Sequence, residues 1–160
     1  MLKHILIVLF ISLNLFSQSQ IIGKSDKIDI PQLNLYNLNA KVDTGAKTSS
    51  LHCSYIDSLD DKFVEFIVLG PSREKFQNKK YTMPIKRIAN VKSSNGKVDK
   101  RYFIELELIL FNKTYITQVS LSQRKNMKFP MLLGRHLLKQ GFIVDVREQN
   151  ISFKEKQSSQ

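Results

Sequence analysis

The feature that most constrains the fold is the alternation of side chains between residues 103 and 110, which gives one fully apolar face. The apolar face carries Ile104, Leu106, Leu108 and Leu110, and the other face carries Glu105 and Glu107. Successive side chains of a β-strand point to opposite faces, so this segment predicts a half-buried strand. No long segment of the chain repeats its apolar residues at helical spacing. We therefore expect an all-β domain with mainly antiparallel pairing.

Further short segments predict strands, and one predicts a helix. Strand-like segments cover residues 63–69, 114–121, 142–146 and 151–153, the last two as a closing pair. A turn is predicted at Asn112-Lys113. The single predicted helix is short and C-terminal, covering residues 135–140, because Gly141 stands where a left-handed residue commonly ends a helix.

Residues 1–20 predict a secretory signal peptide. A short basic start precedes an almost continuously apolar run from residue 5 to residue 16, and serines follow where a signal peptidase needs small side chains. The run is about a dozen residues long, whereas a membrane-spanning helix needs roughly 20; an N-terminal anchor is the alternative. Residues 21–160 are then predicted to form a single periplasmic or secreted domain, without stable membrane insertion once the signal is cleaved.

The positive charge of the chain is concentrated in one segment. The chain has 25 Lys+Arg and 14 Asp+Glu. Ten of the basic residues lie between Arg73 and Arg101, together with only two of the acidic ones. Such a segment is either a solvated surface or a basic arm that attracts an acidic substrate. Nucleic acid is not expected as a partner, because an exported protein rarely meets it. Residues 93–96 (Ser-Ser-Asn-Gly) are typical of a hairpin tip, since Asn-Gly accepts positive φ at both turn positions.

The segment Asp43-Thr44-Gly45-Ala46 carries the candidate chemistry. An aspartic peptidase holds one carboxylate beside another, because the two then share one proton and activate the water between them. The threonine supplies a hydroxyl that can bond a partner loop, the glycine permits a tight backbone, and the alanine leaves room for a close approach. Asp-Thr-Gly also forms ordinary turns, and that is the alternative interpretation of this segment.

A second segment, residues 129–138, predicts an apolar strand that enters Gly134-Arg135 and a short helix. Together the two segments resemble the retropepsin-like aspartic peptidases, in which an apolar-apolar-Gly-Arg element packs beneath the catalytic loop. The resemblance is closer to the bacterial family labelled ATP-dependent zinc protease, and it spans roughly residues 30–147. It is carried by KVDTGAKTSSLH at residues 41–52, by VKSSNG at 91–96 followed by Arg101, and by Arg124, Met127 and Pro130 before LLGR at 132–135. One departure is Gln123, where an acidic residue or Asn is expected.

This resemblance implies an acid-protease barrel in which Asp43 is the catalytic residue. It also implies that the catalytic loop is supported by Thr44, Gly45, Ala46, Gly134 and Arg135. A substrate-binding flap would consist of Ser93, Ser94, Asn95 and Gly96. The chain contains one Asp-Thr-Gly, so a carboxylate pair requires two copies of Asp43 across a two-fold axis. The resemblance therefore implies a homodimer with the active site at its interface; a monomer that keeps the fold without activity is the alternative.

No metal or other cofactor is expected, whatever the family label. The chain lacks His-Glu-x-x-His and the Gly-x-x-x-x-Gly-Lys-Ser/Thr loop of nucleotide-binding proteins. A catalytic zinc needs about three protein ligands, and His52 and Cys53, as strand neighbours, would point to opposite faces. Cys53 is the one cysteine of the chain; we expect it to be buried and inert, with a link between two chains as the alternative.

These observations predict a periplasmic or secreted aspartic endopeptidase that cleaves a peptide or protein substrate, with a preference for acidic peptides suggested by the basic segment. Two other functions remain open: peptide binding without catalysis in the same fold, and binding of an anionic surface through the basic segment. Thr48, Ser49 and Ser50 follow the catalytic segment and are expected either to bond the substrate backbone or to satisfy local backbone groups.

Overall fold

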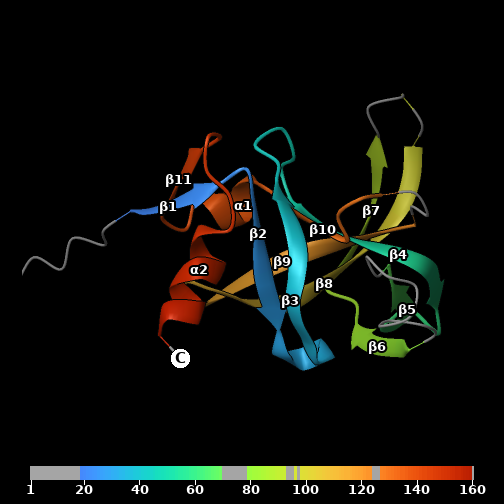
Figure 1. The fold of residues 1–160 in the computed structure, drawn as a ribbon. Coiled ribbons are helices and arrows are strands. Elements are labelled where there is room, and N and C mark those ends of the chain that lie inside the picture. The colour runs from blue at the N-terminus through green and yellow to red at the C-terminus, as the bar shows by residue number, and fades with distance from the viewer. Residues whose placement is uncertain (1–18, 70–78, 93–95, 97, 124–126, 160) are drawn as a thin grey trace, which may run out of the picture.

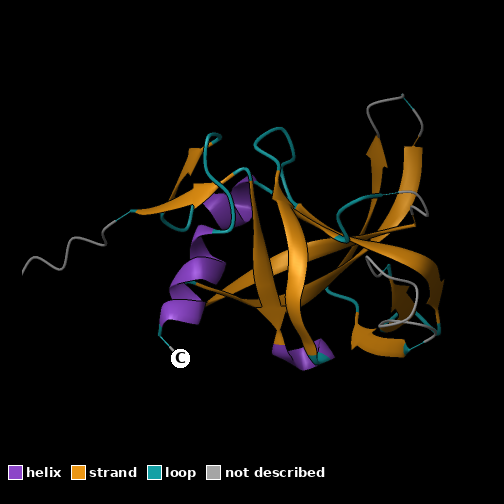
Figure 2. Ribbon diagram, viewed as in Figure 1, coloured by secondary structure: helices purple, strands orange, loops and turns teal. Residues whose placement is uncertain are grey.

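A computed structural model of the protein describes residues 19–69, 79–92, 96, 98–123 and 127–159. The strands are β1 (Gln20–Gly23), β2 (Ser25–Ile30), β3 (Leu35–Val42), β4 (Ser49–Ser58), β5 (Phe63–Val68), β6 (Lys80–Pro84), β7 (Arg87–Lys92), β8 (Val98–Leu110), β9 (Lys113–Gln123), β10 (Met131–Leu133) and β11 (Phe142–Asp145). The helical elements are a 3-10 turn (Pro31–Leu33), α1 (Arg135–Leu138) and α2 (Ile151–Ser158). Figure 2 shows α1 and α2 on one side of the strands.

Six of the described strands close into a barrel (Figure 1). They follow one another around the ring in the order β10, β3, β2, β8, β9 and β4, and the additional pairing of β10 with β4 closes it. Most neighbouring strands are antiparallel, but β10 runs parallel to β3 and β4 runs parallel to β9. β5 and β6 extend the sheet beyond β4, β7 pairs with β8, and a separate two-stranded sheet joins β1 to β11. The predicted all-β, mainly antiparallel barrel is confirmed.

The alternation that predicts a strand at residues 103–110 is realised in β8, which begins earlier than expected, at Val98. Ile104, Leu106 and Leu108 are fully buried, and β9 returns antiparallel to this strand as predicted. These side chains share one core with apolar residues of β2, β3, β4 and β10. Because burying such a side chain contributes roughly 1.5–3 kcal/mol, the shared core is what holds the barrel closed.

The turn between β8 and β9 lies one residue earlier than the predicted Asn112-Lys113. Leu110 pairs with Lys113, so the loop consists of Phe111 and Asn112, whose φ angles are 51° and 53°. Two successive positive φ values match the turn type that best fits a hairpin twist, although a bulky residue rarely adopts them. Phe111 is buried, and its N–H donates to Ser152 Oγ at 2.7 Å. Contacts with a distant segment therefore decide the position of this turn.

The predicted strand at residues 151–153 is wrong, because these residues begin α2; the strand that pairs with β11 is β1. The first N–H groups of a helix lack partners within it. Here the Asp26 carboxylate accepts the N–H groups of Ser152 and Phe153 at 2.9 and 3.0 Å. The capping residue lies 126 positions before Ser152, so local composition cannot reveal it. The described residues thus contain two α-helices, α1 at the predicted place and the unpredicted α2.

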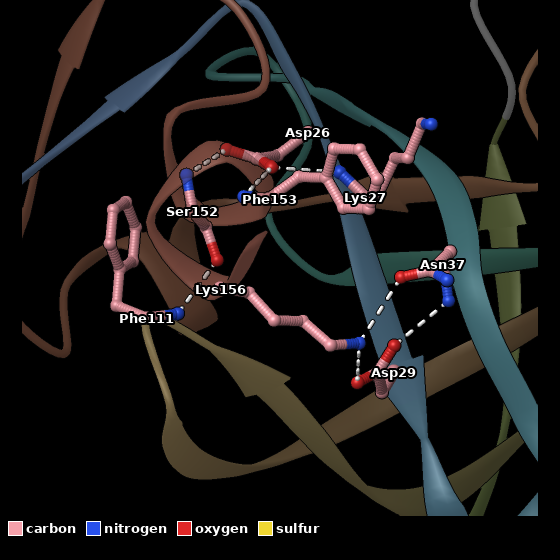
Figure 3. A network of polar contacts seen from close by, with 8 residues as sticks. All are labelled: Asp26, Lys27, Asp29, Asn37, Phe111, Ser152, Phe153 and Lys156. Carbon is pink, nitrogen blue, oxygen red and sulfur yellow. Dashed lines mark hydrogen bonds and ion pairs between the residues drawn. The ribbon is translucent and has the colours of Figure 1, made fainter. Parts of the chain in front are cut away.

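Ionic contacts then hold α2 against β2, as Figure 3 shows. Lys156 Nζ donates to Asp29 Oδ2 at 2.6 Å and to Asn37 Oδ1 at 3.1 Å. On the same helix, the Phe153 ring lies under Lys27 Nζ, 3.9 Å from the ring centroid. Asp29 is 7% exposed, and a buried carboxylate is costly unless it is paired and hydrogen-bonded in this way. The C-terminal helix is therefore an integral part of the domain.

Two predictions fall largely outside the described residues. The predicted signal peptide lies outside them up to residue 18, and Gln20 already belongs to β1. The predicted hairpin tip also lies outside them except for Gly96, which has a φ of 84°. The strands on either side of that tip, β7 and β8, pair as a hairpin. Within the described part of the chain, no helix is long and apolar enough to cross a membrane.

Replacing Asp26 with alanine should lower the free energy of unfolding by roughly 1–3 kcal/mol, because the buried N–H groups at the start of α2 lose their acceptor. Denaturant unfolding followed by circular dichroism measures this change. Asp61→Ala is the matched control, since Asp61 is exposed. If both variants unfold at the same denaturant concentration as the parent, Asp26 does not hold the helix.

Candidate active site

Asp43 begins the loop that joins β3 to β4. Its backbone N–H donates to the Leu133 carbonyl of β10 at 3.0 Å. Its Oδ1 accepts the N–H groups of Gly45 at 3.0 Å and Ala46 at 3.2 Å. A side chain at Gly45 would place its Cβ 3.3 Å from this oxygen, so the glycine lets the carboxylate fold over its own loop. Among the described residues Asp43, which is half-buried, forms no ion pair.

The turn after β10 holds this loop by its backbone carbonyls. The Arg135 guanidinium donates through Nη1 to the carbonyl oxygens of Thr44 and Gly45, at 2.9 and 2.8 Å. The next two carbonyls of the loop accept the backbone N–H groups of Arg135 and of the residue after it, at 2.9 and 3.0 Å. Four successive carbonyl groups of the loop are thus bonded by two neighbouring residues, which restricts the loop to one shape.

Gly134 brings the two segments into direct backbone contact. A Cβ at this position would lie 2.5 Å from the Thr48 carbonyl carbon and 2.8 Å from the Ser49 nitrogen. Its N–H donates to Ser49 Oγ at 3.0 Å. β10 itself pairs with β3 on one side and with β4 on the other, so it ties together the two strands that flank the loop. The glycine is required here by the close approach of two backbones.

The structure therefore brings Asp43 together with every predicted supporting residue. The residues predicted to support its loop are Thr44, Gly45, Ala46, Gly134 and Arg135, and all of them take part in the contacts just described. The expected contact between the Gly-Arg element and the loop is present, with Gly134 buried against the loop backbone. The Arg135 side chain is exposed, so it supports the loop from its surface side.

Asp43 borders a cavity of about 700 Å³. The loop side of the cavity is lined by Asp43, Gly45, Ala46, Lys47 and Thr48, together with Leu132 and His136. Its strand side is lined by Ser50 and His52 of β4, by Gln118, Ser120 and Ser122 of β9, and by residues of the β7–β8 hairpin (Arg87, Ala89, Asn90, Val91, Lys92, Arg101 and Phe103). The β3–β4 loop and the β7–β8 hairpin thus line the same cavity.

The charge of this lining is strongly unequal. Among the described lining residues, Asp43 is the single acidic group, whereas Lys47, Arg87, Lys92 and Arg101 are cationic. Clefts lined by one sign of charge concentrate ligands of the opposite sign. The cavity therefore favours anionic ligands, and part of the basic segment noted in the sequence forms its wall.

The predicted flap is described only in part. Ser93, Ser94 and Asn95 lie outside the described residues, and Gly96 does not line the cavity. The hairpin contributes instead through the strand residues before its tip, such as Val91 and Lys92.

The three hydroxyl residues after the loop take different positions. Ser49 satisfies the backbone N–H of Gly134, whereas Thr48 and Ser50 line the cavity. Sequence reasoning missed Ser120 and Ser122, which line it from β9. The alternation of these serines with apolar residues along one strand is the signal that could have identified them.

His52 and Cys53 point to opposite faces of β4, as expected. Cys53 lies in the core as predicted, and burial raises the pKa of its thiol, which disfavours the reactive thiolate. His52 is buried beside the cavity, and its Nδ1 donates to the Phe129 carbonyl at 2.8 Å, which orients the ring. Among the described residues there is no group of three or more His, Cys, Asp or Glu side chains that could hold a metal ion.

The chain is similar to a solved structure and to several curated proteins. The crystal structure of a Legionella pneumophila protein of unknown function has 28% sequence identity and a TM-score of 0.64, covering 82% of this chain and 97% of that one. Curated relatives include proteins named "Probable alpha-L-glutamate ligase" from Desulfotalea psychrophila and Shewanella halifaxensis. They are 33% and 32% identical over 79% and 80% of this chain. The chain spans only 28% and 29% of the length of these two relatives.

The family comparison covers nearly the whole described domain. Residues 21–155 match the model described as RimB-like, retropepsin-like aspartic endopeptidase RimB. This range includes the β3–β4 loop, the cavity and the turn after β10, and it confirms the resemblance seen in the sequence. The chain therefore belongs to the RimB-like family of retropepsin-like aspartic endopeptidases.

Proposed function

We propose that the protein is an aspartic-type peptidase that hydrolyses acidic peptides, with Asp43 as its catalytic residue. The observation that carries this proposal is the placement of Asp43 at the wall of a cavity whose other charged lining residues, among those the structure describes, are cations. The name of the curated relatives refers to α-L-glutamate, the kind of residue that such a cavity suits. The proposed location is periplasmic or secreted, because of the apolar run at residues 5–16.

The proposed reaction uses two carboxylates. One Asp43 accepts a proton from a water molecule as the water oxygen attacks the peptide carbonyl carbon, while the partner's Asp43, in its protonated form, donates to the carbonyl oxygen. The tetrahedral intermediate then loses its C–N bond, and the leaving nitrogen takes a proton from the pair. The products are a carboxylic acid and an amine, so one water is consumed for each bond broken.

The second carboxylate is proposed to come from another copy of the chain. One Asp-Thr-Gly is present in the sequence, and the tip of its loop, Thr44 and Gly45, is exposed. Large apolar side chains are also exposed on the β1–β11 sheet and just after it, at Ile21, Ile143 and Val146. Exposed apolar groups of this kind favour burial against a partner, which supports a homodimer.

Asp43→Asn should reduce the hydrolysis rate of a hexa-α-L-glutamate peptide by roughly 10²–10⁴-fold, because the variant cannot accept the proton of the attacking water. Product release measured by chromatography tests this, and a thermal melt confirms that the variant is folded. Asp61→Asn, in an exposed position, should retain full activity. Peptide binding without cleavage by the unmodified protein would instead support a peptide-binding module.

Adding an excess of the Asp43→Asn protein to the unmodified protein should lower the activity per molecule of the latter, because mixed dimers contain one competent carboxylate. Saturating peptide prevents the variant from acting merely as a substrate trap. Sedimentation at the assay concentration gives the oligomeric state in parallel. An active species that sediments as a monomer and is unaffected by the variant would exclude the paired mechanism.

Arg87→Gln combined with Lys92→Gln should raise the KM for the glutamate peptide about three- to tenfold, since two cations of the cavity are removed. The kcat should change little, because neither side chain is placed at the reacting bond. Lys113→Gln combined with Lys154→Gln removes the same charge from exposed positions outside the cavity. Equal KM values for the two double variants would show that only net charge matters.

A further inference from the structure

The strand side of the cavity is one continuous sheet face that crosses β7, β8, β9 and β4. One row across these strands consists of Arg87, Phe103, Ser120 and Ser50, each opposite the next. A second row begins with the pair of Ala89 and Arg101 and ends with the pair of Ser122 and His52. Continuing the β8–β9 register by two residues places Arg101 beside Ser122. Since opposite residues share a face, all eight side chains face the cavity that they line.

The β9–β4 half of this face is buried and polar. Ser50 is 7% exposed, His52 1%, Ser120 4% and Ser122 6%. Their strand neighbours Leu51, Cys53, Val119 and Leu121 point the other way, into the apolar core. Buried hydroxyl groups are unfavourable unless they are hydrogen-bonded. Each hydroxyl of such a cluster therefore requires a hydrogen-bond partner.

Ser50 identifies where that partner is needed. Its Oγ is buried and has no hydrogen-bond partner among the described residues. The neighbouring Ser120 Oγ is engaged, since it donates to the Ser49 carbonyl at 3.2 Å. Native proteins rarely leave a buried hydroxyl unsatisfied, because that costs about 1–3 kcal/mol. Ser50 lines the cavity that Asp43 borders, so a ligand that packs against this wall can accept the proton of its hydroxyl once the side chain turns towards it.

The surrounding charges indicate what kind of acceptor fits. The β7–β8 half of the same face carries Arg101 and Arg87, and the Arg87 guanidinium stacks on the Phe103 ring at 3.7 Å, which fixes its position against the wall. A group that accepts from a hydroxyl and is attracted by guanidinium groups is an anion with oxygen acceptors. Among peptide groups, a carboxylate has this chemistry.

We propose that Ser50 and Ser122, together with Arg101, form a carboxylate-binding subsite of the cavity. The subsite receives either an acidic side chain of the peptide or its C-terminal carboxylate. It rests on the proposed function, because the bound carboxylate belongs to the peptide that Asp43 is to cleave. The subsite gives the buried hydroxyl groups a specific function. Long-range attraction by surface cations does not explain why these groups lie at the cavity wall.

The test measures binding in the Asp43→Asn background, so its result does not depend on whether the protein cleaves peptides. The probes are hexa-α-L-glutamate, the same peptide with a C-terminal amide, and the peptide with its glutamates replaced by glutamine. Ser50→Ala should reduce the affinity difference between glutamate and glutamine peptides roughly tenfold, because a hydrogen bond to a charged group is lost. If Ser50→Ala instead reduces the affinity difference between the peptide and its C-terminal amide, the subsite binds the C-terminal carboxylate.

Ser54→Ala is the matched control, since Ser54 lies on the same strand and does not line the cavity. It should leave the preference for glutamate unchanged. The Ser50→Ala protein should melt at the same temperature as its parent or higher, because no side-chain hydrogen bond between described residues is removed. The proposal is overturned if Ser50→Ala leaves all three affinities unchanged, or if it lowers the melting temperature while the preference persists.

Discussion

The candidate site depends on the hydrogen bonds that the turn after β10 donates to the backbone carbonyls of the β3–β4 loop. Arg135 and its neighbour bond four successive carbonyls of the loop, and Gly134 allows the two backbones to touch. The Arg135 side chain reaches a residue 91 positions earlier in the chain. Because β10 is also paired with both strands that flank the loop, the position of Asp43 is set by the closed barrel and not by the loop alone.

The same barrel strands supply both stability and the chemistry of the cavity. β4 and β9 direct one set of side chains into the core and the alternate set towards the cavity. The apolar set holds the strands in register, and the register brings hydroxyl groups of β4 and β9 into line with cations of β7 and β8. A shift of one residue in either pairing would exchange the two faces, so the core itself enforces the polarity of the cavity.

Much of the fold could be predicted from local pattern, and the failures share one cause. The alternation in β8 and the Gly-Arg segment after β10 are local signals, and the structure confirms the strand and the contact with the Asp43 loop. Residues 151–153 form a helix because the Asp26 carboxylate caps it from another part of the chain. The β8–β9 turn is likewise set by the buried Phe111 and its bond to Ser152. In both places a distant contact overrides local composition.

By itself, the sequence determined that this is a β domain carrying one Asp-Thr-Gly loop and a Gly-Arg strand of the retropepsin type, because alternation and contiguous motifs are properties of neighbouring residues. Only the tertiary structure decided that Ser50, whose hydroxyl has no partner in the described part of the chain, the β9 serines and the hairpin cations share a cavity with Asp43. The physical reason is strand register. Residues such as Ser49 and Ser120, 71 positions apart, become neighbours only when the barrel closes, and no local pattern specifies which residues will then face one another.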